Sequence, residues 1–283
     1  MTAAQFIAFA INASMFLIVF ALGLHATLEN ATYLFRHPGL FARSILSMNI
    51  LMLAFALLVC VLFDPSPAIK IALVALAVSP VPPVLPGKQF KAGGSAGYTI
   101  GLLVGAAVVS IVLVPLEIEI LGRAADVGMH MPIARVTSVV LVSIVIPLLA
   151  GITIRHFAPA LAERAAHPVS IFATILLIVA FLPVLFAESV ALWPLVGNGV
   201  IACLILFTLI GLVVGHLLGG PDNDNRTVLA LATATRHPGI AIAIASINFP
   251  NQKVVMAIVL YHLVIGTIVA LPYVRWRKRS HAG

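Results

Sequence analysis

The chain consists largely of apolar runs separated by short polar segments. Nine runs are near 20 residues long, about the length that an α-helix needs to cross 30 Å of hydrocarbon. The connections carry turn residues, as in RHPG at 36–39 and PDNDN at 221–225. The pattern therefore predicts an all-α polytopic membrane protein with one transmembrane domain over residues 1–283. The expected spans are 3–28, 39–63, 67–86, 95–121, 136–156, 168–187, 193–218, 226–248 and 254–274.

Two of these runs contain helix-breaking residues in their interior. Proline removes a backbone donor and clashes with the preceding turn, and irregular backbone at membrane depth persists only where protein or a water-filled cavity satisfies it. Paired broken helices in two halves of a chain indicate the binding site of a secondary transporter built as an inverted repeat. We therefore expect two discontinuous helices that run in opposite directions, with breaks at Pro80, Pro82, Pro83 and Pro86 in the third span and at Pro238 and Gly239 in the eighth.

Composition and charge support this prediction and set an orientation. Hydrophobic residues make up 62% of the chain and charged residues only 9%, whereas a soluble domain carries about a quarter charged residues. The net charge of +7 is explained by basic cytoplasmic loops, so we expect no nucleic-acid partner. An inner-membrane protein with its N-terminus outside and its C-terminus inside places eleven loop residues in the cytoplasm and four outside. The cytoplasmic set is Arg36, Arg43, Lys88, Lys91, Arg155, Arg164, Arg226, Arg275, Arg277, Lys278 and Arg279, and the outer set is Lys70, Arg123, Arg135 and Lys253.

The two ends of the chain and its cysteines narrow the picture further. The first apolar run lacks a basic start and a cleavage site, so we expect it to be a retained helix. Residues 275–283 form a basic tail suited to anionic lipid headgroups. Cys60 and Cys203 both lie in apolar runs and suggest neither a disulfide nor a metal site. No nucleophile–base pair or metal cluster is evident, so we expect no enzyme activity, cofactor or metal.

Four stretches resemble the bile acid:sodium symporter family, part of a wider superfamily of ten-helix carriers. They are GLHATLENATYLFRHPGLF at 23–41, LVALAVSPVPPVLPGKQFKAGGSAGYTIGLLVGAAVVSIVLVP at 73–115, LALATATRHPGIAIAIASINFP at 229–250 and YHLVIGTIVA at 261–270. The likeness starts at the family's second helix, so it implies a nine-span member. The first repeat is then 1–121, without its first helix, and the second is 136–274.

The resemblance also implies an architecture and a function. Spans one, five and six are expected to form a panel, and the other six a core in which the two broken helices cross. A carrier of this type moves a small organic, anionic solute by alternating access between the two sides of the bilayer. Two other readings stay open: a passive channel or facilitator with the same fold, and a membrane sensor that binds a ligand without transporting it.

The positions that bind sodium in the family are largely replaced. The resemblance sets Leu85 and Pro86 where the family has a serine and an asparagine. Ala232 stands in place of a glutamate, and Arg236 in place of a glutamine. A further glutamine aligns with Met48, beside Asn49, and Thr99 is the one family-like hydroxyl that remains. Sodium requires several hard oxygen ligands, so we expect transport without sodium coupling, with a proton as the alternative coupling ion.

Arg236 is the residue that the pattern makes most conspicuous. A guanidinium in the membrane interior costs at least about 2.5–3.5 kcal/mol and normally faces protein or water. Its fixed charge is expected to substitute for the bound cation, and it could receive the negative group of a substrate. The alternative is a structural role, with hydrogen bonds to the free carbonyls of residues 82–86.

The remaining candidates each have a functional and a packing explanation. His237 could carry a proton, because histidine titrates near neutral pH, or could bond to the backbone. Glu117 and Glu119 are expected at the membrane surface, with pairing to Arg236 or proton coupling as the alternative. The small polar residues and His262 could line a cavity or pack helices together. The expected substrate-contacting residues are Arg236, His237, Thr233, Thr235, Ser79, Asn49, Thr99 and His262.

Overall fold

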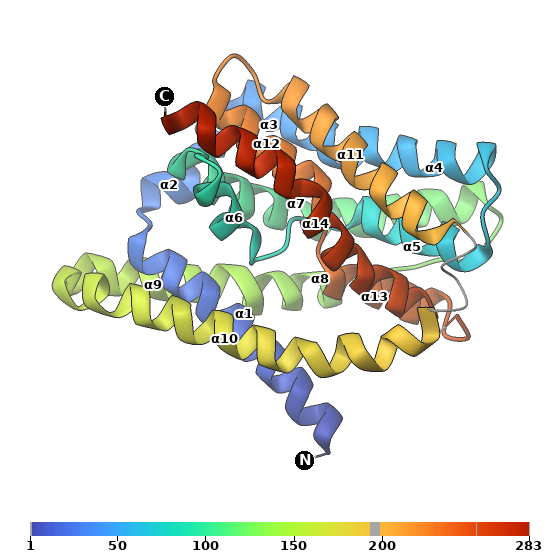
Figure 1. Ribbon diagram of the computed structural model, residues 1–283, viewed down its shortest axis with the longest axis horizontal. Helices are drawn as coiled ribbons and strands as arrows, with labels where there is room; N and C mark the ends of the chain where they lie inside the picture. The colour runs from blue at the N-terminus through green and yellow to red at the C-terminus, as the bar shows by residue number, and fades with distance from the viewer. Residues whose placement is uncertain (1, 193–198, 253, 283) are drawn as a thin grey trace.

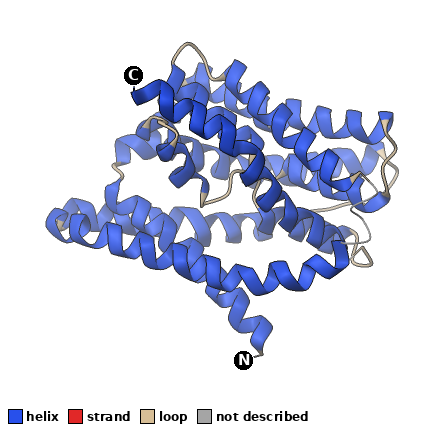
Figure 2. Cartoon of the chain, in the orientation of Figure 1, coloured by secondary structure: helices blue, strands red, loops and turns tan. Residues whose placement is uncertain are grey.

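The computed structural model describes residues 2–192, 199–252 and 254–282, and these residues form helices and connecting loops with no β-strand (Figure 2). Eight helices in this part of the chain are long and apolar enough to cross a membrane. The predicted all-α polytopic fold is therefore confirmed. The third predicted span is not among the eight because its prolines divide it into two short helices, and residues 193–198 of the seventh lie outside the described residues.

One side of the molecule is a layer of three long helical elements that correspond to the first, fifth and sixth predicted spans (Figure 1). Gly23 and Gly151 lie at the contact between the first and fifth. A methyl group on Gly151 would come within 2.4 Å of the Phe20 carbonyl oxygen, so only glycine permits this approach. We call this layer the panel. It consists of α1 (Ala3–His25), α8 (Ile133–Val140), the π-helix η3 (Leu141–Val145), α9 (Ile146–Phe157) and α10 (Pro159–Leu192).

The remaining helices form the core, which holds the largest cluster of buried apolar side chains. Glycines again set the closest contacts, since a methyl group on Gly211 or Gly215 would collide with the backbone of the next helix. The core consists of α3 (Pro38–Ile45), the π-helix η2 (Leu46–Leu51), α4 (Met52–Leu62), α5 (Pro67–Val78), α6 (Leu85–Lys91), α7 (Ala96–Ala124), α11 (Val200–Leu218), α12 (Asn223–Ala234), α13 (Pro238–Asn248) and α14 (Val254–Ala282).

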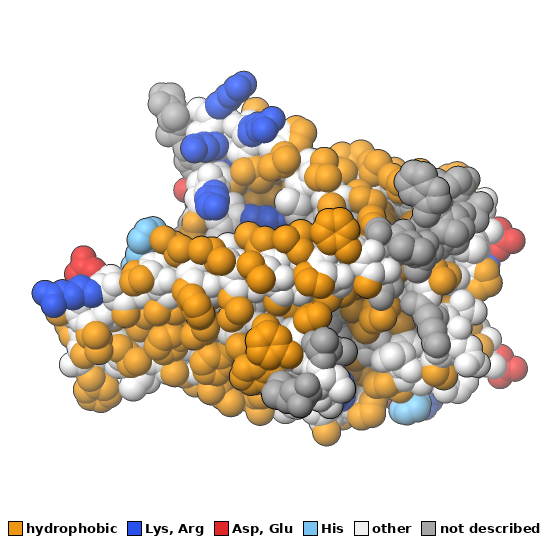
Figure 3. All heavy atoms as spheres, turned by 60° about the horizontal axis from the view of Figure 1, so that its bottom comes forward, with side chains coloured by type: hydrophobic (Ala, Val, Ile, Leu, Met, Phe, Trp, Pro, Cys, Tyr) orange, Lys and Arg blue, Asp and Glu red, His pale blue; other side chains and the backbone are white. Residues whose placement is uncertain are grey.

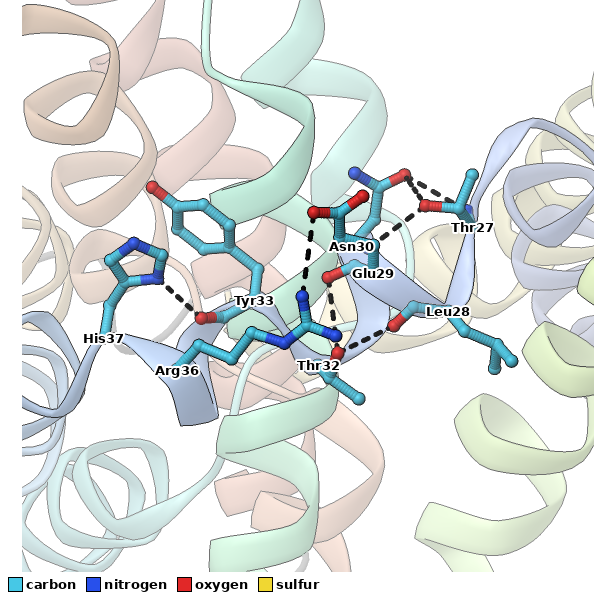
Figure 4. A network of polar contacts seen from close by, with 8 residues as sticks. All are labelled: Thr27, Leu28, Glu29, Asn30, Thr32, Tyr33, Arg36 and His37. Atoms are coloured by element: carbon cyan, nitrogen blue, oxygen red, sulfur yellow. Dashed lines mark hydrogen bonds and ion pairs between the residues drawn. The ribbon is translucent and has the colours of Figure 1, made fainter.

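A short helical linker joins the panel helix α1 to the core helix α3. It comprises α2 (Leu28–Thr32) and the 3-10 helix η1 (Tyr33–Arg36). Thr27 and Asn30 cap its start reciprocally, and the His37 ring stacks on Tyr33 at 4.1 Å and bonds to the Tyr33 carbonyl at 2.8 Å (Figure 4). These contacts define the linker's shape locally.

The linker is seated on α7 through a row of glycines. A methyl group on Gly101 would lie 2.9 Å from the Leu34 nitrogen, and one on Gly97 or Gly105 would meet Tyr33 or Leu34 at the same distance. Leu34 itself is fully buried. The linker therefore packs mainly against the core helix α7.

The surface matches a chain that spans a lipid bilayer. Apolar side chains cover most of the visible face, and most of the Lys and Arg side chains on it gather at one end, the left of Figure 3, where the C-terminus lies in Figure 1. Large exposed apolar residues such as Val61, Phe157 and Phe186 belong to this surface. The protein is a multi-pass membrane protein with an apolar belt.

Candidate functional site

The two broken helices meet at their interruptions. α5 ends at Val78, the following residues are extended or turn-like, and α6 begins at Leu85. α12 ends at Ala234, and Pro238 begins α13, at a position where proline's missing N–H costs nothing. The backbone N–H of His237 donates to the Pro80 carbonyl at 2.8 Å. This bond joins the interruptions directly, so the predicted crossing of two discontinuous helices is present.

Arg236 is fully buried at this junction. Its guanidinium donates one hydrogen bond to the Ser79 carbonyl at 3.2 Å and another to the Met48 carbonyl. Ser79 caps the C-terminal end of α5, where carbonyls lack helical partners and the helix dipole is negative. Met48 lies in the π-helix η2, where the usual helical hydrogen-bond pattern is interrupted. Arg236 therefore joins the α12–α13 break to two other elements by satisfying backbone carbonyls.

The guanidinium has further neighbours of two kinds. Its central carbon lies 6.0 Å from the centre of the Phe207 ring, a distance typical of a cation–π contact. Glu117 on α7 is within electrostatic range of it, and the Asn49 side chain hydrogen-bonds to the Glu117 carboxyl. Within the described residues, Nε of Arg236 has no hydrogen-bond partner. A buried cation is thus held by carbonyl dipoles and one distant carboxyl group.

A cavity of about 540 Å³ lies between the panel and the core. The panel contributes Asn12, Met15 and Phe181 to its lining, and the core contributes the break residues Pro82, His237, Pro238 and Gly239. A space of this size holds a drug-sized solute, and mostly apolar walls with a few polar groups are typical of small-molecule sites. The cavity lies where movement of the panel against the core would change its access.

Two basic side chains line this cavity. Lys88, on α6, is half-buried and donates a 2.6 Å hydrogen bond to the Thr267 hydroxyl of α14. Arg135, near the start of α8, is exposed. No acidic residue is among the described residues that line the cavity. The cavity therefore has a positive charge from each of its two walls and suits a negatively charged group.

The model of the Sodium Bile acid symporter family matches residues 13–193, more than half of the chain. The chain belongs to this family. The match to the Sodium Bile acid symporter family extends from α1 into α10 and includes the first broken helix, α5–α6. No curated protein matches the chain. Membership confirms the resemblance inferred from sequence and makes the protein a transporter of the Sodium Bile acid symporter type, since members of this family are transporters rather than enzymes.

The structure places the expected substrate-contacting residues of this family member in two groups. His237 lines the cavity, beside the break residues Pro82, Pro238 and Gly239. The others belong to core helices or to the breaks between them and are not among the residues that line the cavity, so their contact with a solute stays a prediction. This second group consists of Arg236, Thr233, Thr235, Ser79, Asn49, Thr99 and His262.

Several residues of the second group make identifiable contacts within the core. The Thr233 hydroxyl bonds to that of Ser47 at 2.7 Å and so connects α12 with η2. The Ser79 hydroxyl donates to the Ala75 carbonyl at 2.6 Å. The His262 ring packs edge-on against Phe207, with ring centres 5.4 Å apart. These contacts support the packing explanation for Thr233, Ser79 and His262 without testing the substrate role.

Sequence reasoning missed one feature of the site and held another only as an alternative. It assigned Lys88 to a loop, because Pro86 marks the end of the third span, whereas Pro86 stands in the first turn of α6 and the helix continues to Lys91. It also expected Glu117 at the membrane surface together with Glu119, and gave pairing with Arg236 or proton coupling as the alternative. Glu119 is exposed and pairs with Arg123 at 2.5 Å, but Glu117 is half-buried and directed toward the Arg236 region. The surface prediction is therefore wrong for Glu117.

Proposed function

We propose that the protein is a secondary carrier that moves a small organic anion across the inner membrane by alternating access. The observation that carries this proposal is the cavity between panel and core, with its largely apolar lining and the basic residues Lys88 and Arg135 on opposite walls. Apolar walls favour a solute with an apolar body through the hydrophobic effect. The two cations favour a carboxylate or sulfonate on that body.

Alternating access follows from the way in which the cavity is built. Its two walls belong to separate layers, and the core wall contains the junction at which the two broken helices are hydrogen-bonded to each other. In an inverted-repeat transporter, residues 1–121 and 136–274 would be the two repeats, and the panel would rock against the core around this junction. Such a movement opens the cavity to one side of the membrane and closes it to the other.

Sodium coupling is not part of the proposal. Ala232, Leu85 and Pro86 offer no side-chain oxygen where the family resemblance expects a glutamate, a serine and an asparagine, and Arg236 brings a positive charge to the same junction. A cation would be repelled by this guanidinium. Arg236 instead supplies the fixed charge that stabilises the crossing, and a proton is the coupling ion that we infer.

The orientation rests on the distribution of basic residues. The end of the molecule that carries the C-terminus also carries most of the visible Lys and Arg (Figure 3). Cytoplasmic loops of membrane proteins carry this excess. We therefore infer a cytoplasmic C-terminus, an N-terminus outside, and a basic tail at 275–283 close to anionic lipid headgroups.

Two measurements on the purified full chain test the proposal. A thermal-shift screen of organic anions with apolar bodies, bile acids included, should give stabilisation that is the same in sodium and potassium buffers. Uptake of a stabilising anion into proteoliposomes should be saturable and accelerated by the same anion preloaded inside. A rise in the unfolding temperature that requires sodium would contradict the proposal that solute binding is independent of sodium. Conductance without saturation would indicate a channel, and binding without flux would indicate a sensor.

A further inference from the structure

Glu117 differs from every other acidic residue whose contacts are described, because it is directed into the membrane domain. It lies on α7, one of the eight helices long enough to span the bilayer. Its Oε2 atom is buried and has no hydrogen-bond partner within the described residues, while the Asn49 side chain hydrogen-bonds to its carboxyl group. Burying an ionised carboxylate oxygen without a hydrogen-bond donor costs free energy. Burying the neutral, protonated carboxyl group costs much less.

Glu119 provides a comparison two residues further along the same helix. Residues two apart on an α-helix point to nearly opposite faces. Glu119 faces outward and forms an exposed ion pair with Arg123. The helix thus separates one acidic side chain that is exposed from one that is half-buried, and this separation gives an internal control.

The charged group that acts on Glu117 is Arg236, from the break between α12 and α13. Arg236 makes no ion pair within 4 Å in the described part of the chain. It is also within electrostatic range of His262 on α14. In a medium of low effective dielectric constant, charges interact over several ångströms with far more energy than in water. The ionisation of Glu117 therefore decides whether the charge on Arg236 is balanced from inside the protein.

His237, the residue next to Arg236 in the chain, is committed to a backbone hydrogen bond. Its Nδ1 accepts a hydrogen bond from the Ile240 N–H at 3.4 Å and caps the start of α13. Protonation of Nδ1 would remove this acceptor and place a second positive charge beside the guanidinium. The capping role thus requires a neutral His237 ring.

We propose that Glu117 is a proton-binding site inside the membrane domain, beside Asn49 and within electrostatic range of the fixed positive charge of Arg236. When the Oε2–H bond breaks, the proton leaves to water and the carboxylate balances Arg236. When the proton returns, Arg236 is left without an anionic partner. In a carrier of the kind proposed above, on which this consequence rests, an organic anion in the cavity beside His237 then becomes the group that balances the charge. Binding of the proton to Glu117 therefore favours binding of the anion in the cavity, and the reverse also holds.

The proton site can be tested without any solute. Infrared difference spectra of the purified protein across a pH titration should contain a protonated-carboxyl band that is present in wild type and in Glu119→Gln and absent in Glu117→Gln. In Arg236→Gln the band should persist to higher pH, because the carboxylate has lost its cation. Asn49→Ala removes the hydrogen bond alone and should act in the same direction if Arg236→Gln does not fold. A titrating band that survives in Glu117→Gln, or one that neither neighbour affects, would overturn the proposal.

A transport measurement separates this inference from the proposed function. With a bile acid as the probe anion, an inward pH gradient should drive accumulation in proteoliposomes of wild type and Glu119→Gln. Glu117→Gln should still exchange the anion across the membrane but lose at least about tenfold in gradient-driven accumulation, equivalent to 1.4 kcal/mol of lost coupling. Gradient-driven accumulation that persists in Glu117→Gln would contradict the proton site. Absence of exchange in wild type would instead contradict the proposed function, and the infrared titration would still decide on Glu117.

Discussion

Gly23 of α1 and Gly151 of α9 face each other so closely that a methyl group on Gly151 would lie 2.7 Å from the Gly23 Cα atom. The backbones of two panel helices touch at this point. Replacement by alanine requires the helices to separate, and overpacking of this kind typically costs about 1–3 kcal/mol. We predict that Gly151→Ala lowers the midpoint of thermal unfolding of the purified protein.

Gly39→Ala is the matched control for this experiment. Gly39 lies in the first turn of α3, and a methyl group there would meet nothing within 4 Å. Alanine favours the helix over glycine by up to about 1 kcal/mol. Gly39→Ala should therefore leave the unfolding midpoint unchanged or raise it. An equal loss of stability in both variants would show that the close contact does not matter.

Arg236→Gln removes the guanidinium that satisfies the Ser79 and Met48 carbonyls. Leaving buried polar groups without partners costs about 1–3 kcal/mol each, so the variant should be less stable, with a lower yield and a lower unfolding midpoint. Uptake measured on the folded fraction then separates the two roles considered for Arg236. Full transport by that fraction would exclude contact between Arg236 and the solute.

Lys88→Met removes a positive charge from the cavity wall and keeps most of the side chain's length. If the solute is an anion, loss of a charged hydrogen bond of about 1.5–3 kcal/mol should raise the KM for uptake by at least about tenfold, with a smaller effect on the maximal rate. Lys91→Met is the control, because Lys91 lies at the end of the same helix, is exposed and does not line the cavity. Equal KM values in the two variants would contradict an anion site at Lys88.

Asp64 lies outside the membrane spans, in the loop between α4 and α5. Lys70 donates a 2.5 Å hydrogen bond to its carboxylate and lowers the pKa of Asp64. The pair therefore contributes stability at pH values above the ordinary aspartate pKa of about 3.9, and this contribution is lost as the pH falls through the lowered value in the folded protein.

Asp64→Asn removes the charge and keeps a residue that tolerates the backbone φ of 42° at this position. Because the Asp64 side chain is exposed, the unfolding midpoint near neutral pH should fall only slightly. The difference between wild type and Asp64→Asn should shrink as the pH falls below 4. A difference that grows under acid conditions would contradict the assignment of the Asp64 pKa.

The order and bounds of the spans could be predicted from the sequence because a lipid bilayer sets the length of a spanning helix and requires its backbone groups to be hydrogen-bonded. Apolar runs near 20 residues long predicted the positions of the spans. Pro82 and Pro238 predicted the interruptions, because proline lacks the backbone N–H that a continuous helix needs and lipid offers no substitute. The continuation of the third span as α6 was not predicted. Proline is a breaker within a helix and a good first residue of one, and the sequence around Pro86 fits both uses.

The contacts between distant elements were beyond sequence reasoning. The expected structural alternative for Arg236 named the carbonyls of residues 82–86, whereas its partners are Ser79 and Met48, the second supplied by a π-helix that has no simple sequence signal. The direction of Glu117 depends on the rotation of α7 about its axis. Tertiary packing sets that rotation, and the helix's nearly uniform apolar surface does not reveal it.

The packing of the linker against α7 determines which backbone bonds can act as a hinge between the panel and the core. Because Leu34 is buried and Gly101 of α7 holds the backbone of Asn30 and Leu34 at contact distance, we expect this segment to travel with the core. The connection to α1 is then reduced to the extended residues Ala26 and Thr27. A disulfide bridge between the linker and α7 should consequently leave a working carrier mobile, whereas one between the linker and α1 should arrest it in a single state.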